Sequence, residues 1–132
     1  MKNAGMVFAA ISGCLAVILG AMGAHALSDK LSPKSMHAYE TATHYQMLHS
    51  LAIIAMVAIR DKYPLYSKTI IGLFMAGIVL FAGSIYVLVI GDLTGTDLKF
   101  VGPLTPLGGL CFIAGWATLV VSAIKCKQTI KE

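Results

Sequence analysis

Residues 40–60 read ETATHYQMLHSLAIIAMVAIR, and this stretch decides the fold. Its second part, residues 51–59, is wholly apolar, while its first part contains Glu40, two histidines, a tyrosine and a glutamine. The rest of the chain is also poor in charge: 12% of the 132 residues are charged, against about 25% in an ordinary soluble domain. That is too little charge to cover a water-facing surface, so the composition predicts a membrane protein.

Four stretches contain no Lys, Arg, Asp or Glu: residues 3–27, 41–59, 69–90 and 101–124. A helix needs roughly 20 mostly apolar residues to cross the hydrocarbon, and helices satisfy their own backbone hydrogen bonds there. We therefore predict an all-α fold, a four-transmembrane-helix bundle that forms a single integral membrane domain over residues 1–132. The predicted spans are about 4–27, 40–60, 69–90 and 104–124.

The first span has an alternative interpretation as a signal peptide. Lys2 precedes an apolar run, and Ala24-His25-Ala26 resembles an A-x-A cleavage site. The run is longer than the 7–15 residues typical of a signal peptide, and its Gly and Ala pattern is typical of a packing helix. We therefore favour a retained span.

The basic residues predict the orientation. With four spans, both termini and the central loop lie on one side, which carries seven of the ten Lys and Arg residues: Lys2, Arg60, Lys62, Lys68, Lys125, Lys127 and Lys131. The other side carries Lys30, Lys34 and Lys99. Because Lys and Arg in short loops favour the cytoplasm, we expect cytoplasmic N- and C-termini. The basic residues form no face apart from the helix ends, so we expect no nucleic-acid partner.

Small residues predict where helices pack. Residues Ala9, Gly13, Ala16, Gly20 and Gly23 recur at intervals of four and three, and small side chains let helices approach closely in a membrane. We expect packing contacts at Gly13, Gly20, Gly23, Gly83, Gly115 and Trp116. Enlarging Gly20 to leucine should then force helices apart. Cys14, Cys111 and Cys126 have no paired spacing, so we predict neither a structural disulfide nor a C-x-x-C zinc site.

Two loops end in helix-start signals. Ser32 can cap the second helix with Pro33 at its first position, and Thr105 and Pro106 can do the same for the fourth. The second helix should then run from about Pro33 to Arg60.

The polar residues of the second span allow three interpretations. His25, Glu40 and His44 are weak candidates for a divalent metal site, although the Glu-x-x-His repeat of metal-binding bundles is absent. His49 suits an ion or proton path, because an ionisable group inside a membrane is a candidate functional residue. The third interpretation, which we favour, is hydrogen bonding between helices. We expect a neutral His49 bonded to Ser84, Tyr86, Thr105 or a carbonyl of residues 102–106. The candidate polar cluster is His25, Tyr45, Gln46, His49, Ser84, Tyr86 and Thr105.

Four motifs in all four spans carry a resemblance to a known family. They are LGAMGAHAL (19–27), YQMLHSLAI (45–53), LFAGSIY (80–86) and TPLGGLCFIAGW (105–116). Together they resemble the YgdD/YwdK family of small bacterial inner-membrane proteins, a family of unknown function. The resemblance implies a multi-pass protein of the bacterial cytoplasmic membrane. It brings no activity, substrate or cofactor.

The sequence thus favours a structural, interaction or accessory role in the membrane, with no enzymatic activity and no cofactor. The alternative is a transporter or binder of a small apolar molecule or ion in a cavity between helices. An enzyme is the third hypothesis and would need the metal at His25, Glu40 and His44. The expected partners are the lipid bilayer and either a second copy of the chain or another membrane protein.

Overall fold

The computed structural model describes residues 4–129, and in this range every regular element is a helix. Four helices are long and apolar enough to cross a membrane, namely Ala4–Leu27, Pro33–Ile59, Ser67–Thr94 and Lys99–Cys126. The predicted all-α fold with four spans is confirmed. The elements are α1 (Ala4–Met22), η1 (Gly23–Leu27), α2 (Pro33–Ile59), α3 (Ser67–Gly77), η2 (Ile78–Ala82), α4 (Gly83–Thr94), η3 (Lys99–Val101) and α5 (Leu104–Thr129).

The first and third spans each contain one π-helical turn. In the first span η1 extends α1, and in the third span η2 joins α3 to α4 without a break. The backbone N–H of Gly83 donates to the carbonyl of Ile78, five residues earlier. Such turns widen a helix locally and are frequent at functional sites.

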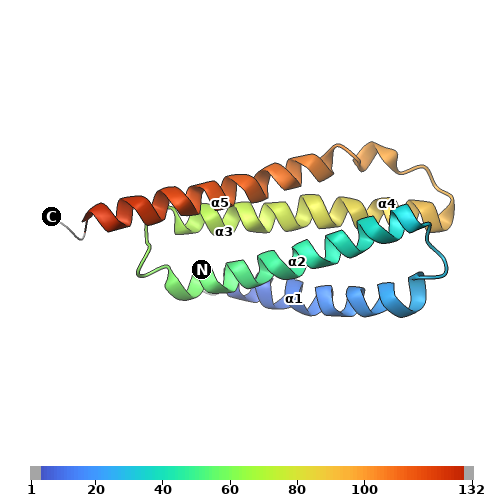
Figure 1. Cartoon of the computed structure of the whole chain (residues 1–132), viewed down its shortest axis with the longest axis horizontal. Coiled ribbons are helices and arrows are strands. Elements are labelled where there is room, and N and C mark those ends of the chain that lie inside the picture. The colour runs from blue at the N-terminus through green and yellow to red at the C-terminus, as the bar shows by residue number, and fades with distance from the viewer. Residues whose placement is uncertain (1–3, 130–132) are drawn as a thin grey trace.

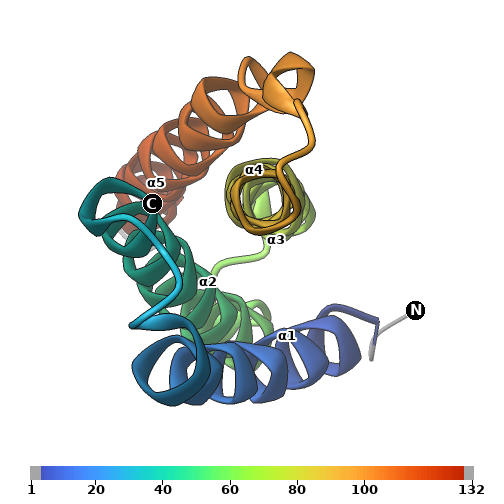
Figure 2. The same ribbon diagram turned by 90° about the vertical axis from the view of Figure 1, so that its right-hand side faces the viewer.

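The spans run antiparallel, so the beginning of α1 and the end of α5 lie toward the same end of the bundle (Figure 1). The third span packs against both α2 and α5, and α1 packs mainly against α2. Viewed along the bundle, α1 and α5 lie on opposite sides (Figure 2). The spans therefore pack in the order α1, α2, third span and α5, with α2 and the third span in the middle.

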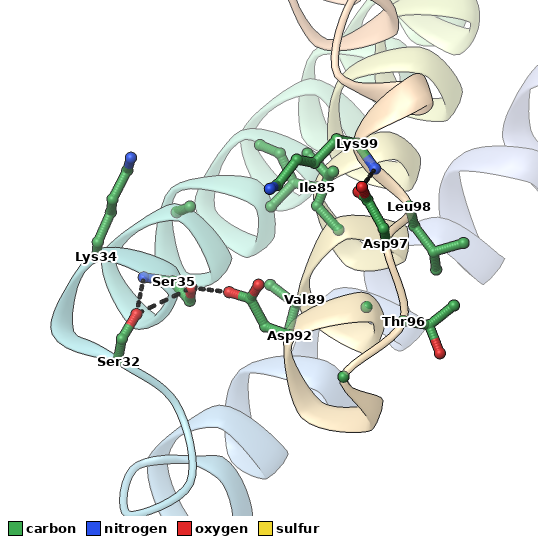
Figure 3. A pocket seen from close by; sticks show the side chains of 14 residues that line it. Ser32, Lys34, Ser35, Ile85, Val89, Asp92, Thr96, Asp97, Leu98 and Lys99 are labelled. Carbon is green, nitrogen blue, oxygen red and sulfur yellow. Dashed lines mark hydrogen bonds between the residues drawn. The ribbon is translucent and has the colours of Figure 1, made fainter.

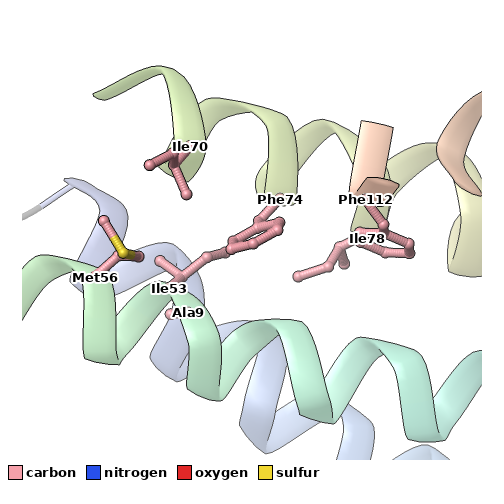
Figure 4. Close-up of a cluster of buried hydrophobic side chains, with 7 residues drawn as sticks. All are labelled: Ala9, Ile53, Met56, Ile70, Phe74, Ile78 and Phe112. Carbon is pink, nitrogen blue, oxygen red and sulfur yellow. The ribbon is translucent and has the colours of Figure 1, made fainter. Parts of the chain in front are cut away.

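Two apolar clusters hold the spans together. The first joins α1, α2, the third span and α5 through seven buried side chains, which Figure 4 shows: Ala9, Ile53, Met56, Ile70, Phe74, Ile78 and Phe112. The second lies toward the other end of the bundle and contains Leu31, Tyr39, Ala42, Ala82, Ile85 and Val89. Large apolar side chains such as Val17, Ile113 and Val121 are exposed on the outside, where lipid would cover them.

Several glycines lie where the spans pack too closely for a larger side chain. An ideal Cβ on Gly108 would lie 2.3 Å from the backbone nitrogen of Phe81. On Gly115 and Gly23 it would lie 2.5 Å from the ring of Phe74 and 2.6 Å from the ring of Tyr39. Gly13 makes only ordinary contact, 3.9 Å from Ser50.

Gly20 and Gly83 correct the packing prediction. A Cβ at either position would meet no heavy atom within 4 Å in the part of the chain that the structure describes. Within one chain, Gly20 therefore makes no close helix contact of the kind expected for it, and the contact at Gly83 is missing in the same way. Trp116 is 43% exposed, and it still contacts the ring of Phe74.

The helix-start signals differ in outcome. Ser32 caps α2, since its Oγ accepts the backbone N–H of Ser35 at 3.2 Å, and Pro33 is the first helical residue. The fourth helix begins at Leu104, so Thr105 lies inside α5 and is not its cap. The three cysteines are free thiols.

Candidate functional site

The polar side chains of α2 divide between two neighbouring faces of the helix. Residues four apart share a face, and here Gln46 and Ser50 face α1 while Tyr45 and His49 face the third and fourth spans. All four lie in the middle of the membrane-spanning helix. The arrangement produces two polar sites, one on each side of α2.

The first site is a hydrogen-bond network around Gln46. Its Nε2 donates to the carbonyl of Ser12 at 2.9 Å, and its Oε1 accepts the hydroxyl of Tyr86 at 2.6 Å. Ser50 Oγ lies 2.8 Å from Ser12 Oγ and 2.7 Å from the carbonyl of Gln46. The network therefore ties together α1, α2 and α4. Tyr39 adds another link, because its hydroxyl donates to the carbonyl of Leu19 at 2.6 Å.

The second site is the buried imidazole of His49, which is 2% exposed. Its Nδ1 lies 2.8 Å from the carbonyl of Tyr45, and its Nε2 lies 3.2 Å from the indole Nε1 of Trp116. A carbonyl only accepts and an indole N–H only donates, so Nδ1 carries the proton and Nε2 is bare. His49 is neutral in this geometry.

Aromatic rings enclose His49. The imidazole stacks on Phe112 with ring centroids 3.6 Å apart, and Phe74 meets it edge-on at 5.3 Å. The expected partners of His49 were Ser84, Tyr86, Thr105 or a carbonyl of residues 102–106, and this expectation is wrong. The sequence offered no sign that Trp116 and His49 meet, because the pairing depends on how α2 and α5 are rotated toward each other.

The remaining predicted residues do not join one site. Ser84 and Thr105 pair with each other at 2.6 Å and link the third span to α5. His25, Glu40 and His44 are exposed. No group of three or more His, Cys, Asp or Glu residues is placed to hold a metal in the part of the chain that the structure describes. The structure therefore does not assemble the metal site considered for these three residues.

A groove runs beside the Gln46 network, between α1 and the third span. It has a volume of about 320 Å³, at the small end of the range for ligand pockets. Its walls are mostly apolar and come from Phe8, Ile11, Leu15, Ile78, Val79, Ala82 and Gly83, with Ser12, Gln46 and Tyr86 as polar members. We call it the side groove. The π-helical turn η2 supplies three of its wall residues.

The sequence predicted Gln46 and Tyr86 but missed Ser12, Ser50 and the groove. Ser12 lies beside the small-residue seam of α1, three residues after Ala9 and four before Ala16. Ser50 lies one helical turn after Gln46. Both spacings were visible in the sequence, and they would have pointed to a polar contact between α1 and α2.

Comparison with known proteins decides the family. The profile of the family "Protein of unknown function (DUF423)" matches residues 19–109. The chain belongs to this family. It is 40% identical over 122 residues to the UPF0382 membrane protein YwdK of Bacillus subtilis (strain 168), covering 91% of this chain and 95% of the relative. It is 38% identical over 124 residues to the UPF0382 inner membrane protein YgdD of Escherichia coli (strain K12), covering 93% and 91%.

No solved structure matches the chain. The relatives and the four apolar helices together make this family member a small multi-pass protein of the bacterial inner membrane. The resemblance drawn from the four sequence motifs is confirmed.

Proposed function

We propose that this protein is a non-catalytic accessory protein of the inner membrane that binds a hydrocarbon chain in the side groove. The observation that carries the proposal is the groove itself, an apolar channel at mid-depth of the spans, between helices that do not close over it. Gly83 supports it further, since its missing side chain leaves open space on the groove wall.

The polar members of the groove favour an apolar ligand. Gln46 uses its oxygen on Tyr86 and its nitrogen on Ser12. No buried side-chain nitrogen or oxygen lacks a hydrogen-bond partner among the described residues. Polar groups that are already paired gain little from a polar ligand, so hydrocarbon is the occupant that the groove suits best.

The lining of the groove suits a single acyl chain. Apolar residues of α1 and the third span form most of its wall, and both spans are apolar enough to lie in hydrocarbon. An acyl chain can therefore lie along the groove beside the Gln46 network.

Photo-crosslinking in reconstituted membranes tests the proposal. The probe is a phospholipid with a diazirine in the middle of one acyl chain, and mass spectrometry locates the label. We expect labelling to concentrate on the groove residues Ile11, Leu15 and Val79. Ile113 and Val121 on α5 are the comparison, because their side chains are similarly exposed.

Two glycine variants sharpen the experiment. Gly83→Leu adds a side chain on the groove wall, at a position where a Cβ meets no atom within 4 Å, and Gly20→Leu adds the same side chain at another such position that does not line the groove. Gly83→Leu should reduce groove labelling several-fold, and Gly20→Leu should leave it unchanged. Uniform labelling of all outward-facing apolar residues would contradict the proposal. So would a dimer in native mass spectrometry that Gly83→Leu dissociates, because a second copy would then occupy the groove.

A further inference from the structure

A second, larger cavity lies at the end of the bundle opposite the beginning of α1 and the end of α5. It has a volume of about 630 Å³ and lies between the beginning of α2, the end of α4 and residues 95–99 (Figure 3). It is separate from the side groove: no residue lines both. We call it the end cavity.

The end cavity carries two charges of each sign. Lys34 and Lys99 line it together with Asp92 and Asp97. Neither lysine ammonium has a hydrogen bond or an ion pair with any residue whose side chain the structure describes. In Figure 3 the side chain of Lys99 reaches across toward α2.

Each carboxylate is held by a donor of the protein. Asp92 accepts the hydroxyl of Ser35 through Oδ2, and Asp97 accepts the backbone N–H of Lys99 through Oδ1 at 3.1 Å. One oxygen of each carboxylate thus remains able to accept a hydrogen bond from a ligand. The cavity therefore presents two carboxylates that each accept one hydrogen bond from the protein, and two lysine ammonium groups that make none with the described side chains.

The wall of the cavity on the membrane side is apolar. Ala38 on α2 and Ile85, Leu88 and Val89 on the third span line it below the charged residues. The charged residues lie at the ends of the spans, where hydrocarbon gives way to headgroups. This gradient from apolar to charged matches an amphiphile rather than a small water-soluble ion.

We propose that the end cavity binds the head of a zwitterionic phospholipid that carries both a phosphate and an ammonium group. The phosphate lies near Lys34 and Lys99, and the ammonium lies near Asp92 and Asp97. The first part of an acyl chain follows the apolar wall. The equal numbers of positive and negative side chains select this head over a purely anionic one, which the two carboxylates repel.

Native mass spectrometry of the full chain with defined lipids tests the proposal. The probes are phosphatidylethanolamine, phosphatidylglycerol and the water-soluble head glycerophosphoethanolamine. The wild-type chain should retain phosphatidylethanolamine in preference to phosphatidylglycerol and should not retain the soluble head. Equal or better retention of phosphatidylglycerol would overturn the zwitterionic assignment, and retention of the soluble head would overturn the assignment to a lipid.

Matched variants assign the charges. Lys99→Gln removes one ammonium group that would face the lipid phosphate and should reduce phosphatidylethanolamine retention severalfold. Lys30→Gln, in the same end loops but outside the cavity, should have no effect. Asp97→Asn keeps an acceptor oxygen for the Lys99 N–H and should shift the preference toward phosphatidylglycerol. The proposal fails if Lys30→Gln and Lys99→Gln lose the lipid equally, or if Asp97→Asn leaves the preference unchanged.

Discussion

His49 and Gln46 explain why the middle of α2 carries polar groups. Every polar side-chain atom of these two residues has a hydrogen-bond partner, either on another helix or on the backbone of α2 itself. A polar group left unpaired in hydrocarbon costs several kcal/mol, so these contacts specify how the spans fit together. A proton on Nε2 of the neutral His49 would break the hydrogen bond that Nε2 accepts from the Trp116 indole N–H. The imidazole is therefore well suited to link α2 to α5 and poorly suited to carry protons.

A double-mutant cycle on His49 and Trp116 tests this role. His49→Leu leaves the indole N–H unpaired, and Trp116→Phe leaves the imidazole Nε2 unpaired, so each variant should lower the free energy of unfolding by about 1–3 kcal/mol. The loss in the double variant should be smaller than the sum of the two single losses by about 0.6 kcal/mol, and at most about 1.7, as measured for hydrogen bonds between membrane helices. Reversible unfolding in detergent micelles measures each free energy of unfolding. Losses that add to within about 0.3 kcal/mol would show that the pair is not coupled.

At the scale of the helix, glycine spacing predicts packing only in part. The α1 seam does bury Ala9, Ala16 and Gly23, yet Gly20 in the same seam has open space beside it. Spacing gives the angular position of a residue on its helix, but it does not give the distance to the neighbouring helix. Gly108, whose added Cβ would come nearest to another atom among the glycines, was not among the predicted packing positions for this reason.

Adjacent glycines in α5 provide a matched test of packing. Gly108→Ala would place a Cβ against the Phe81 backbone, which cannot move aside as a side chain can. We expect it to lower the free energy of unfolding by about 1–3 kcal/mol, the usual cost of overpacking. Gly109→Ala meets no atom within 4 Å among the described residues and should raise stability by up to about 1 kcal/mol through helix propensity. Equal effects on the unfolding midpoint would contradict the contact at Gly108.

At the scale of the whole molecule, composition and uncharged runs were enough to predict the four spans, because membrane thickness alone fixes the length of a helix that crosses it. The pairing of side chains across helices could not be predicted from the sequence, because it depends on how far each helix is rotated about its own axis. His49 with Trp116 and Ser84 with Thr105 illustrate this limit. The side groove and the end cavity depend on the same rotations. The sequence therefore predicted a cavity between helices only as an alternative and could not place it.

The orientation in the membrane remains a prediction from the basic residues. The structure places the beginning of α1 and the end of α5 toward one end of the bundle (Figure 1). We propose that this end faces the cytoplasm, since seven of the ten Lys and Arg residues lie in the terminal segments and central loop of the sequence, and such residues favour the cytoplasm. Reporter fusions after Glu132 should be active in the cytoplasm, and fusions at Thr96 should be active outside. Cytoplasmic activity at Thr96 would reverse the orientation.

A hydrocarbon chain in the side groove would be detected by methyl NMR of the isotope-labelled chain in lipid bicelles. The measured signals are nuclear Overhauser effects between acyl-chain methylenes and individual protein methyl groups. We expect stronger effects at Ile11, Leu15 and Val79 than at Ile113 and Val121, and their loss in Gly83→Leu but not in Gly20→Leu. Effects of equal strength on all five residues, unchanged by either variant, would contradict the proposal. The groove would then make only the contacts with bulk lipid that every lipid-facing surface makes.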